Sequence, residues 1–127
     1  MLLYPEESHK ILGAYFEVNR NLPKGLLESV YEKALVYELR QRGLHVEEQC
    51  PLTVNYKGMN IGKFIADVVV ENNIILELKA VQCITSENLA QLLNYLAITG
   101  CQVGYVLNFS GKREYRRLLR TDQSAAE

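Results

Sequence analysis

Residues 64–79, FIADVVVENNIILELK, place two acidic side chains and a lysine in sequence that otherwise has the composition of buried strands. Asp67 stands in the first apolar run, and Glu77 and Lys79 stand in the second, after Glu71-Asn72-Asn73. Charged residues rarely occupy such runs unless they are paired or bind a metal ion. The segment therefore predicts two adjacent strands that carry a charged site.

The turn between the strands decides whether these charges meet, because side chains alternate between the two faces of a sheet. If Val70 pairs with Ile74 across a three-residue turn, Asp67 falls opposite Glu77, and Lys79 shares their face. If the turn has only two residues, Asp67 opposes Leu78 and the charges separate. The site requires the longer turn or a bulge, and both occur in hairpins.

Two carboxylates held close repel each other, and a divalent cation between them relieves the repulsion. Mg²⁺ prefers few carboxylates together with water and substrate phosphate. Such an ion activates water and neutralises a leaving oxygen, and Lys79 is placed to hold the water or the phosphate. The pattern therefore favours phosphodiester hydrolysis. The alternative is that Glu77 and Lys79 lie on the solvent face of a half-exposed strand.

The composition removes several other classes of protein. With 127 residues, of which 48% are hydrophobic and 23% charged, the chain is expected to form one domain, residues 1–127, with a flexible tail over 121–127. No apolar run approaches the roughly 20 residues of a membrane helix, and no signal peptide is seen, so a cytoplasmic location is expected. Three cysteines without a CxxC pair and only two histidines argue against zinc and leave oxygen ligands.

Changes in hydrophobic period divide the chain into nine elements. The spacing of apolar residues and the turn signals predict helices over about 6–18, 25–41, 86–98 and 112–120, and strands over about 44–49, 52–56, 59–70, 74–80 and 102–109. This order predicts an α/β fold in which a mixed sheet has helices on its faces.

Two helices bring further polar side chains toward the strand ends. Gln91 and Tyr95 are four residues apart and share a helix face, and so do Glu28 and Tyr31, which are three apart. The plainer interpretation is an amphipathic helix with a surface Gln and a half-buried Tyr. For Glu28, it is an acidic residue favoured by the dipole of the first helical turn.

Taken together, these motifs resemble a known family. The chain is similar to the small GxxExxY proteins of the PD-(D/E)XK nuclease superfamily over about residues 5–119. The motifs that carry the resemblance are Gly25-x-x-Glu28-x-x-Tyr31, Phe64-x-Ala66-Asp67, Glu77-Leu78-Lys79, Gln91-Leu92-Leu93-Asn94-Tyr95-Leu96 and Gly104-x-x-x-Asn108-Phe109. The proline that names the superfamily is replaced by Ala66, a variation usual in this family.

The resemblance implies a restriction-endonuclease-like fold and a Mg²⁺-dependent nuclease, with Mn²⁺ as a substitute. Carried over by position, the metal ligands would be Asp67, Glu77, the Leu78 carbonyl and Glu28. Lys79 would be the catalytic lysine, and Gln91 with Tyr95 would match the QxxxY motif of one branch. Because the superfamily includes members without catalysis, the alternative is a silent nucleic-acid-binding or protein-interaction domain of the same fold.

The expected partner is nucleic acid, with DNA favoured over RNA. The net charge of −1 gives no global attraction to phosphate, so contact would depend on a local patch. The basic residues near the C-terminus are the candidates for it, or form only a solvated helix face: Lys112, Arg113, Arg116, Arg117 and Arg120. The small size leaves room for a homodimer. A small-molecule hydrolase is disfavoured, since no serine has a nearby histidine and no glycine-rich phosphate loop is present.

Overall fold

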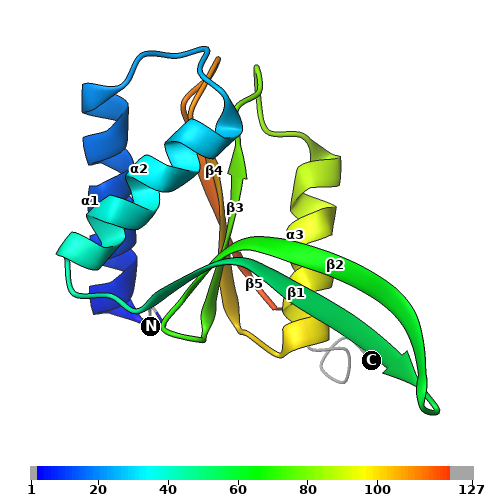
Figure 1. Cartoon of the computed structure of the whole chain (residues 1–127). Coiled ribbons are helices and arrows are strands. Elements are labelled where there is room, and N and C mark those ends of the chain that lie inside the picture. Colours follow the sequence, from blue (N-terminus) through cyan, green and yellow to red (C-terminus); the bar gives the residue numbers. More distant parts are fainter. Residues whose placement is uncertain (1–2, 121–127) are drawn as a thin grey trace.

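The protein is described by a computed structural model that covers residues 3–120, so the tail predicted over 121–127 lies outside the described residues. In chain order the elements are α1 (Pro5–Asn21), α2 (Glu28–Gln41), β1 (Val46–Tyr56), β2 (Met59–Val70), β3 (Ile74–Lys79), α3 (Ser86–Thr99), β4 (Val103–Asn108) and β5 (Tyr115–Leu119), as Figure 1 shows.

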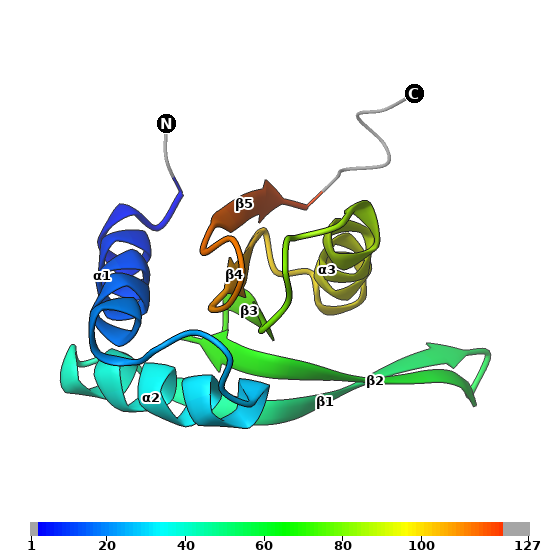
Figure 2. The ribbon, with the colours of Figure 1, turned by 90° about the horizontal axis from the view of Figure 1, so that it is seen from above.

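The strands form one sheet in the order β1-β2-β3-β4-β5. Strands β3 and β4 are parallel, joined through α3, and the other neighbouring pairs are antiparallel. Figure 2 shows α1 and α2 on one side of β3 and β4, and α3 on the other. The predicted central mixed sheet flanked by helices is therefore confirmed.

Each face of the sheet has its own core. Side chains of α1 and α2 pack on one face of β3 and β4. On the other face, Leu92, Tyr95 and Leu96 of α3 pack against Ile75 and Val106. The contact of α3 with β4 is tight at Gly104, where a Cβ would lie 2.7 Å from Leu92 Cδ1 and 3.1 Å from the Ile75 carbonyl oxygen.

Four predicted elements differ from the structure. The second helix begins at Glu28, not at residue 25, because Gly25 has φ +92° and Leu27 is extended. The strands predicted over 44–49 and 52–56 form a single strand, β1, in which Pro51 is tolerated because β1 lies at the edge of the sheet.

The helix predicted over residues 112–120 is wrong. Residues Tyr115–Leu119 form β5, which pairs with β4 from Val103↔Leu119 to Leu107↔Tyr115. The pairing satisfies backbone groups along the outer side of β4 that would otherwise remain unpaired beside a buried strand. Tertiary pairing therefore overrides the local preference of this basic segment.

Strands β1 and β2 are about twice as long as β3 and project beyond the body of the molecule (Figure 1). We call residues 50–66 of this hairpin the arm. Near its base, Phe64 packs against Tyr95 of α3, with ring centroids 5.8 Å apart. Farther out, Tyr56, Met59 and Ile61 are exposed. Among residues 3–120, no helix is both long and apolar enough to cross a membrane.

Candidate functional site

The hairpin of β2 and β3 uses the longer turn. Val70 pairs with Ile74, and the positive φ values of Glu71 (+53°) and Asn72 (+58°) reverse the chain between them. Continued past Val68↔Leu76, this register sets Asp67 against Glu77. The Asp67 amide donates to Glu77 Oε1 at 3.3 Å, and the Leu78 amide donates to Asp67 Oδ2 at 2.8 Å. The predicted register is confirmed, and the two carboxyl groups lie side by side.

The backbone opposite Asp67 is irregular. Gln49 of β1 has φ +49°, and the paired positions skip from Glu48↔Val68 to Cys50↔Ala66. A residue with such a φ in a strand stores strain, and strain of this kind gathers at functional sites. At this position the Asp67 amide donates to the Glu77 carboxyl.

Burial dominates the electrostatics of the carboxyl pair. Glu77 is only 3% exposed, so the alternative that it lies on a solvent face is wrong. Loss of hydration raises the pKa of Glu77 to about 8, and the neighbouring charge of Asp67 adds to the shift. Burial also raises the pKa of Asp67, although its bond from the Leu78 amide and the charge of Lys79 act in the opposite direction.

Lys79 extends from the end of β3 toward α3. Its Nζ lies 3.4 Å from Gln91 Oε1, and Gln91 Nε2 donates to the Tyr95 hydroxyl at 3.0 Å. Tyr95 is buried, and its pKa is raised first by burial and then by the charge of Glu77. The structure therefore places Gln91 at the lysine and Tyr95 next to Gln91, on the shared helix face that their spacing predicted. Gln91 remains exposed, and only Tyr95 belongs to the core.

Glu28 is the first residue of α2 and faces the same charges. Burial raises the pKa of Glu28, Asp67 raises it further, and Lys79 lowers it. These influences place the Glu28 carboxyl in the electric field of the pair, although no hydrogen bond joins it to Asp67 or Glu77 within the described structure.

The position of Glu28 depends on its own loop. The Tyr31 hydroxyl donates to the Pro23 carbonyl oxygen at 2.6 Å and accepts from the Leu26 amide at 3.1 Å. The Tyr31 ring stacks on Phe109, with centroids 5.0 Å apart. Tyr31 thus anchors the loop before α2 to the end of β4 and sets where the helix begins. It is a positioning residue and does not itself touch the carboxyl pair.

Sequence reasoning missed one acidic group near the site. Glu32, one helical turn after Glu28, is 9% exposed and accepts a hydrogen bond from Gln49 Nε2 at 2.9 Å. Burial raises its pKa to about 7, with further contributions from Glu48 and Asp67. The signal was present, because Glu28 and Glu32 are four apart and flank Tyr31 of the apolar stripe.

The C-terminal basic residues lie on β5, in the loop before it and directly after it, at the opposite edge of the sheet from β1. Most of their donors are occupied. Lys112 and Arg116 pair with Glu114, and Arg113 donates to the carbonyl oxygens of Asn19, Leu22 and Phe109. Arg117 donates to the Tyr105 hydroxyl and to the Leu3 carbonyl oxygen, and Arg120 is exposed. The fold does not bring this group together with Asp67.

The donor set at the carboxyl pair fits a hard cation such as Mg²⁺. Asp67 and Glu77 supply oxygen atoms, and a divalent charge would offset both their burial and their mutual repulsion. Within residues 3–120, no three His, Cys, Asp or Glu side chains converge on one point as a metal cluster. Mg²⁺ is compatible with this arrangement, since it usually binds through one or two carboxylates and retains water.

The chain matches a known protein family along almost its whole length. Residues 5–118 match the family model of the PD-(D/E)XK nuclease superfamily. A search of curated proteins found no significant match. Among solved structures, the chain is similar to the crystal structure of SSO0001, with 18% sequence identity and a TM-score of 0.55 over 77% of this chain and 52% of that one. The chain thus spans about half the length of that protein, and the likeness supports the restriction-endonuclease-like α/β fold alone.

Proposed function

Because this chain belongs to the PD-(D/E)XK nuclease superfamily, we propose that it hydrolyses phosphodiester bonds of nucleic acid in a Mg²⁺-dependent reaction, with Mn²⁺ as a substitute and DNA as the favoured substrate. One observation carries the proposal. Asp67, which is half-buried, and Glu77, which is buried, form a carboxyl pair where the pairing of β2 and β3 ends, and both feel the charge of Lys79. A buried acidic pair is costly unless a cation or a proton neutralises it.

In this proposal the Asp67 and Glu77 side chains, with the Leu78 carbonyl, would hold the ion, and Glu28 would contact it through water. When bound, the ion would lower the pKa of a water molecule and neutralise charge on the leaving oxygen. The Lys79 ammonium would hold the attacking water or a phosphate oxygen. Gln91 would orient Lys79, and Tyr95 would in turn hold Gln91, as their hydrogen bonds allow.

The motif around Glu28 supports assignment to the GxxExxY group of this superfamily. Gly25 and Tyr31 fix the loop from which the helix starts, and Glu28 is the motif residue that faces the carboxyl pair. This division of roles accounts for the spacing of the three residues.

The test is Mn²⁺-dependent cleavage of single-stranded and duplex DNA and RNA by the wild type and by Lys79→Ala. Loss of one charge-stabilising donor typically lowers the rate by about 10²- to 10³-fold, and we expect a loss of that order. Lys57→Ala, at the tip of the arm, is the matched lysine control and should cleave normally.

Metal binding is measured in parallel by titration with Mn²⁺. We expect Asp67→Ala and Glu77→Ala to abolish binding, and Lys79→Ala to retain it. Metal binding by a wild type that cuts none of the four substrates would overturn the proposed catalysis and favour a silent nucleic-acid-binding domain. Cleavage that survives Lys79→Ala would overturn the role given to the lysine.

A further inference from the structure

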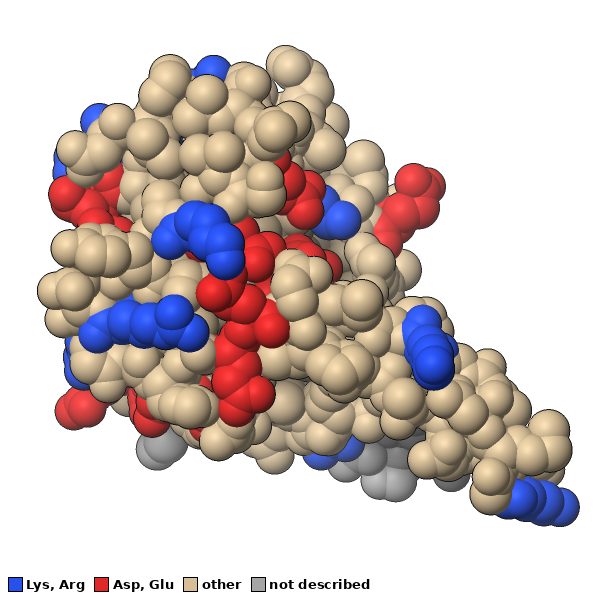
Figure 3. All heavy atoms as spheres, viewed as in Figure 1, with Lys and Arg blue, Asp and Glu red and all other residues tan. Residues whose placement is uncertain are grey.

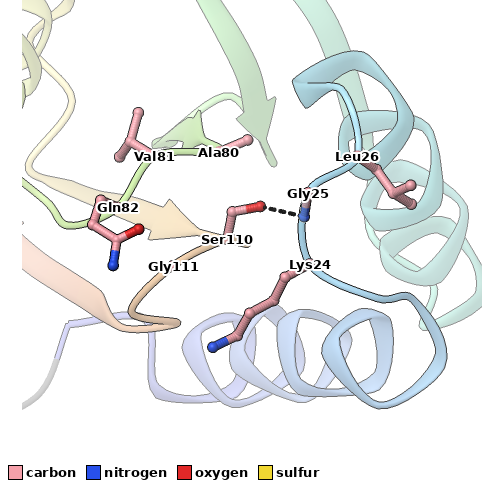
Figure 4. A pocket seen from close by; sticks show the side chains of 8 residues that line it. All are labelled: Lys24, Gly25, Leu26, Ala80, Val81, Gln82, Ser110 and Gly111. Atoms are coloured by element: carbon pink, nitrogen blue, oxygen red, sulfur yellow. Dashed lines mark hydrogen bonds between the residues drawn. The ribbon is translucent and has the colours of Figure 1, made fainter.

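A shallow pocket of about 470 Å³ lies where β3 and β4 end, and Figure 4 shows the residues that line it. Three segments form it: the loop between α1 and α2, the segment after β3, and the segment after β4. Because β3 and β4 are parallel, the pocket lies beyond the carboxyl ends of both strands. Ligands of open α/β sheets bind in this position.

A buried asparagine fixes two of these segments. Asn108 has no exposed surface, and the two N–H groups of its Nδ2 are shared among the carbonyl oxygens of Val81, Ser110 and Lys112, which lie 2.8–2.9 Å from Nδ2. Its Oδ1 accepts from the Val81 amide at 3.0 Å. One side chain therefore holds the segment after β3 against the segment after β4. Fully satisfied buried networks of this kind make a region rigid.

The remaining contacts close the pocket. Gly111 has φ +50°, and a Cβ at this position would lie 2.4 Å from the Gln82 carbonyl oxygen, so only glycine allows the two backbones to approach this closely. The Lys112 amide donates to the same oxygen at 2.7 Å. On the third side, the Gly25 amide donates to Ser110 Oγ at 2.9 Å (Figure 4). The walls are thus set before any ligand arrives, which lowers the entropy loss on binding.

The pocket carries the opposite charge to the adjoining acidic site. No Asp or Glu lines it, and Lys24 and Gln82 project from its walls (Figure 4). Ala80 of the pocket directly follows Lys79, so the pocket adjoins the acidic site along the chain. With a net charge of −1 and four carboxyl groups at or near the site, a polyanion needs local attraction to approach.

We propose that this pocket binds a backbone phosphate of the nucleic-acid strand, adjacent to the phosphate that is cleaved. Lys24 would supply the charge and Gln82 a hydrogen bond, and the rigid segments around Asn108 would fix the distance from the bound phosphate to Lys79. This inference rests on the proposed function, because it names the part of the substrate that positions the strand in that site.

The test is a methylphosphonate scan, in which a set of DNA oligonucleotides each has one backbone phosphate replaced by an uncharged methylphosphonate. Binding is measured by fluorescence anisotropy with the Glu77→Gln protein, so that hydrolysis does not interfere. We expect one position to weaken binding by roughly five-fold, the effect of a single exposed charge contact. Lys24→Gln, made in the Glu77→Gln protein, should weaken binding of the unmodified strand by the same factor. In that protein, the methylphosphonate at the sensitive position should cause no further loss of binding.

Gln82→Ala is the second variant and should reduce the effect at the same position. Lys57→Gln, far out on the arm, is the control and should keep the full position-specific loss. Equal losses at all positions, or losses that add to that of Lys24→Gln, would overturn the inference. So would a requirement for a terminal phosphate, because the pocket would then bind a strand end. Because the scan measures binding alone, its result can be interpreted even if the protein does not cleave nucleic acid.

Discussion

At the scale of single residues, Glu77 carries the largest electrostatic cost in the site. Its pKa is about 8 in the folded protein, against 4.5 for a carboxyl group in water, so the folded state favours the protonated form. Unfolding therefore releases this proton at intermediate pH. It follows that the free energy of unfolding falls as the pH rises from about 4.5 toward 8.

We expect Glu77→Gln to remove most of this fall. In the absence of divalent ions, the variant should be more stable than the wild type at pH 8, by on the order of a few kcal/mol, and closer to it at pH 5. Urea unfolding at a series of pH values between 5 and 8 measures the difference.

Glu87→Gln is the control for this series, since Glu87 lies exposed in the first turn of α3 and should leave the slope unchanged. A smaller slope should persist in Glu77→Gln, because the pKa of Glu32 is also raised, to about 7. An identical slope in Glu77→Gln and wild type would contradict the burial of an ionisable carboxyl at this position.

Tyr31 acts on the site through its hydroxyl group. In Tyr31→Phe the ring can keep its stacking on Phe109, but the bonds to the Pro23 carbonyl and the Leu26 amide are lost. We expect a loss of about 1 kcal/mol in stability. Because the loop also sets the start of α2, kcat of the proposed nuclease should fall while KM changes little.

The matched control is Tyr37→Phe, because Tyr37 lies on the same helix and is 59% exposed. It should match the wild type in both chemical denaturation and cleavage. A Tyr31→Phe protein with unchanged stability and unchanged kcat would contradict the anchoring role.

At the scale of elements, the arm divides at the point where its packing on α3 ends. Leu52 and Phe64 belong to the core that faces α3, whereas Tyr56, Met59 and Ile61 are exposed beyond it. A two-stranded hairpin has little stability without packing. The outer part of the arm therefore contributes little to the stability of the fold.

We expect the body to tolerate removal of residues 54–62. Thr53 and Lys63 face each other in the register, so an Asn-Gly turn can join them directly. The melting temperature should change by only a few degrees, on the order of 1 kcal/mol or less. Thermal unfolding followed by circular dichroism measures it. A shortened protein that fails to fold would show that the outer arm is structurally required.

At the scale of the whole molecule, the two cores share the central strands. Side chains of β3 and β4 alternate between the core beneath α1 and α2 and the core beneath α3, so neither core can open without disturbing the other. Residues 5–119 are therefore proposed to unfold as one unit. Circular dichroism and tyrosine fluorescence should give coincident transitions.

Divalent ions should shift this single transition. If Mg²⁺ or Mn²⁺ binds the folded protein alone, a concentration 100-fold above Kd adds about 2.7 kcal/mol to stability. We expect the melting temperature of the wild type to rise with ion concentration and that of Asp67→Asn to remain unchanged. An equal rise in both proteins would indicate that the ion binds elsewhere.

Much of the fold and of the candidate site follows from local pattern. Asp67, Glu77 and Lys79 interrupt apolar strands at a spacing that requires a three-residue turn or a bulge if they are to meet, and the structure has the three-residue turn. Gln91 and Tyr95 share a face because helical geometry alone requires it. These inferences succeed because alternation and helical period act over a few residues.

Other features depend on contacts between distant segments. Tyr115–Leu119 has a composition suited to a helix. It forms a strand because its backbone pairs with the outer side of β4. The sequence by itself determined the hairpin that pairs the carboxyl groups, the helix that carries Gln91, and the order of helices and strands as far as β4. Only the tertiary structure decided the edge strand, the burial that raises the pKa of Glu77, and the pocket formed around Asn108. The reason is that burial and strand pairing depend on contacts between residues far apart in the chain. Local sequence patterns do not predict such contacts.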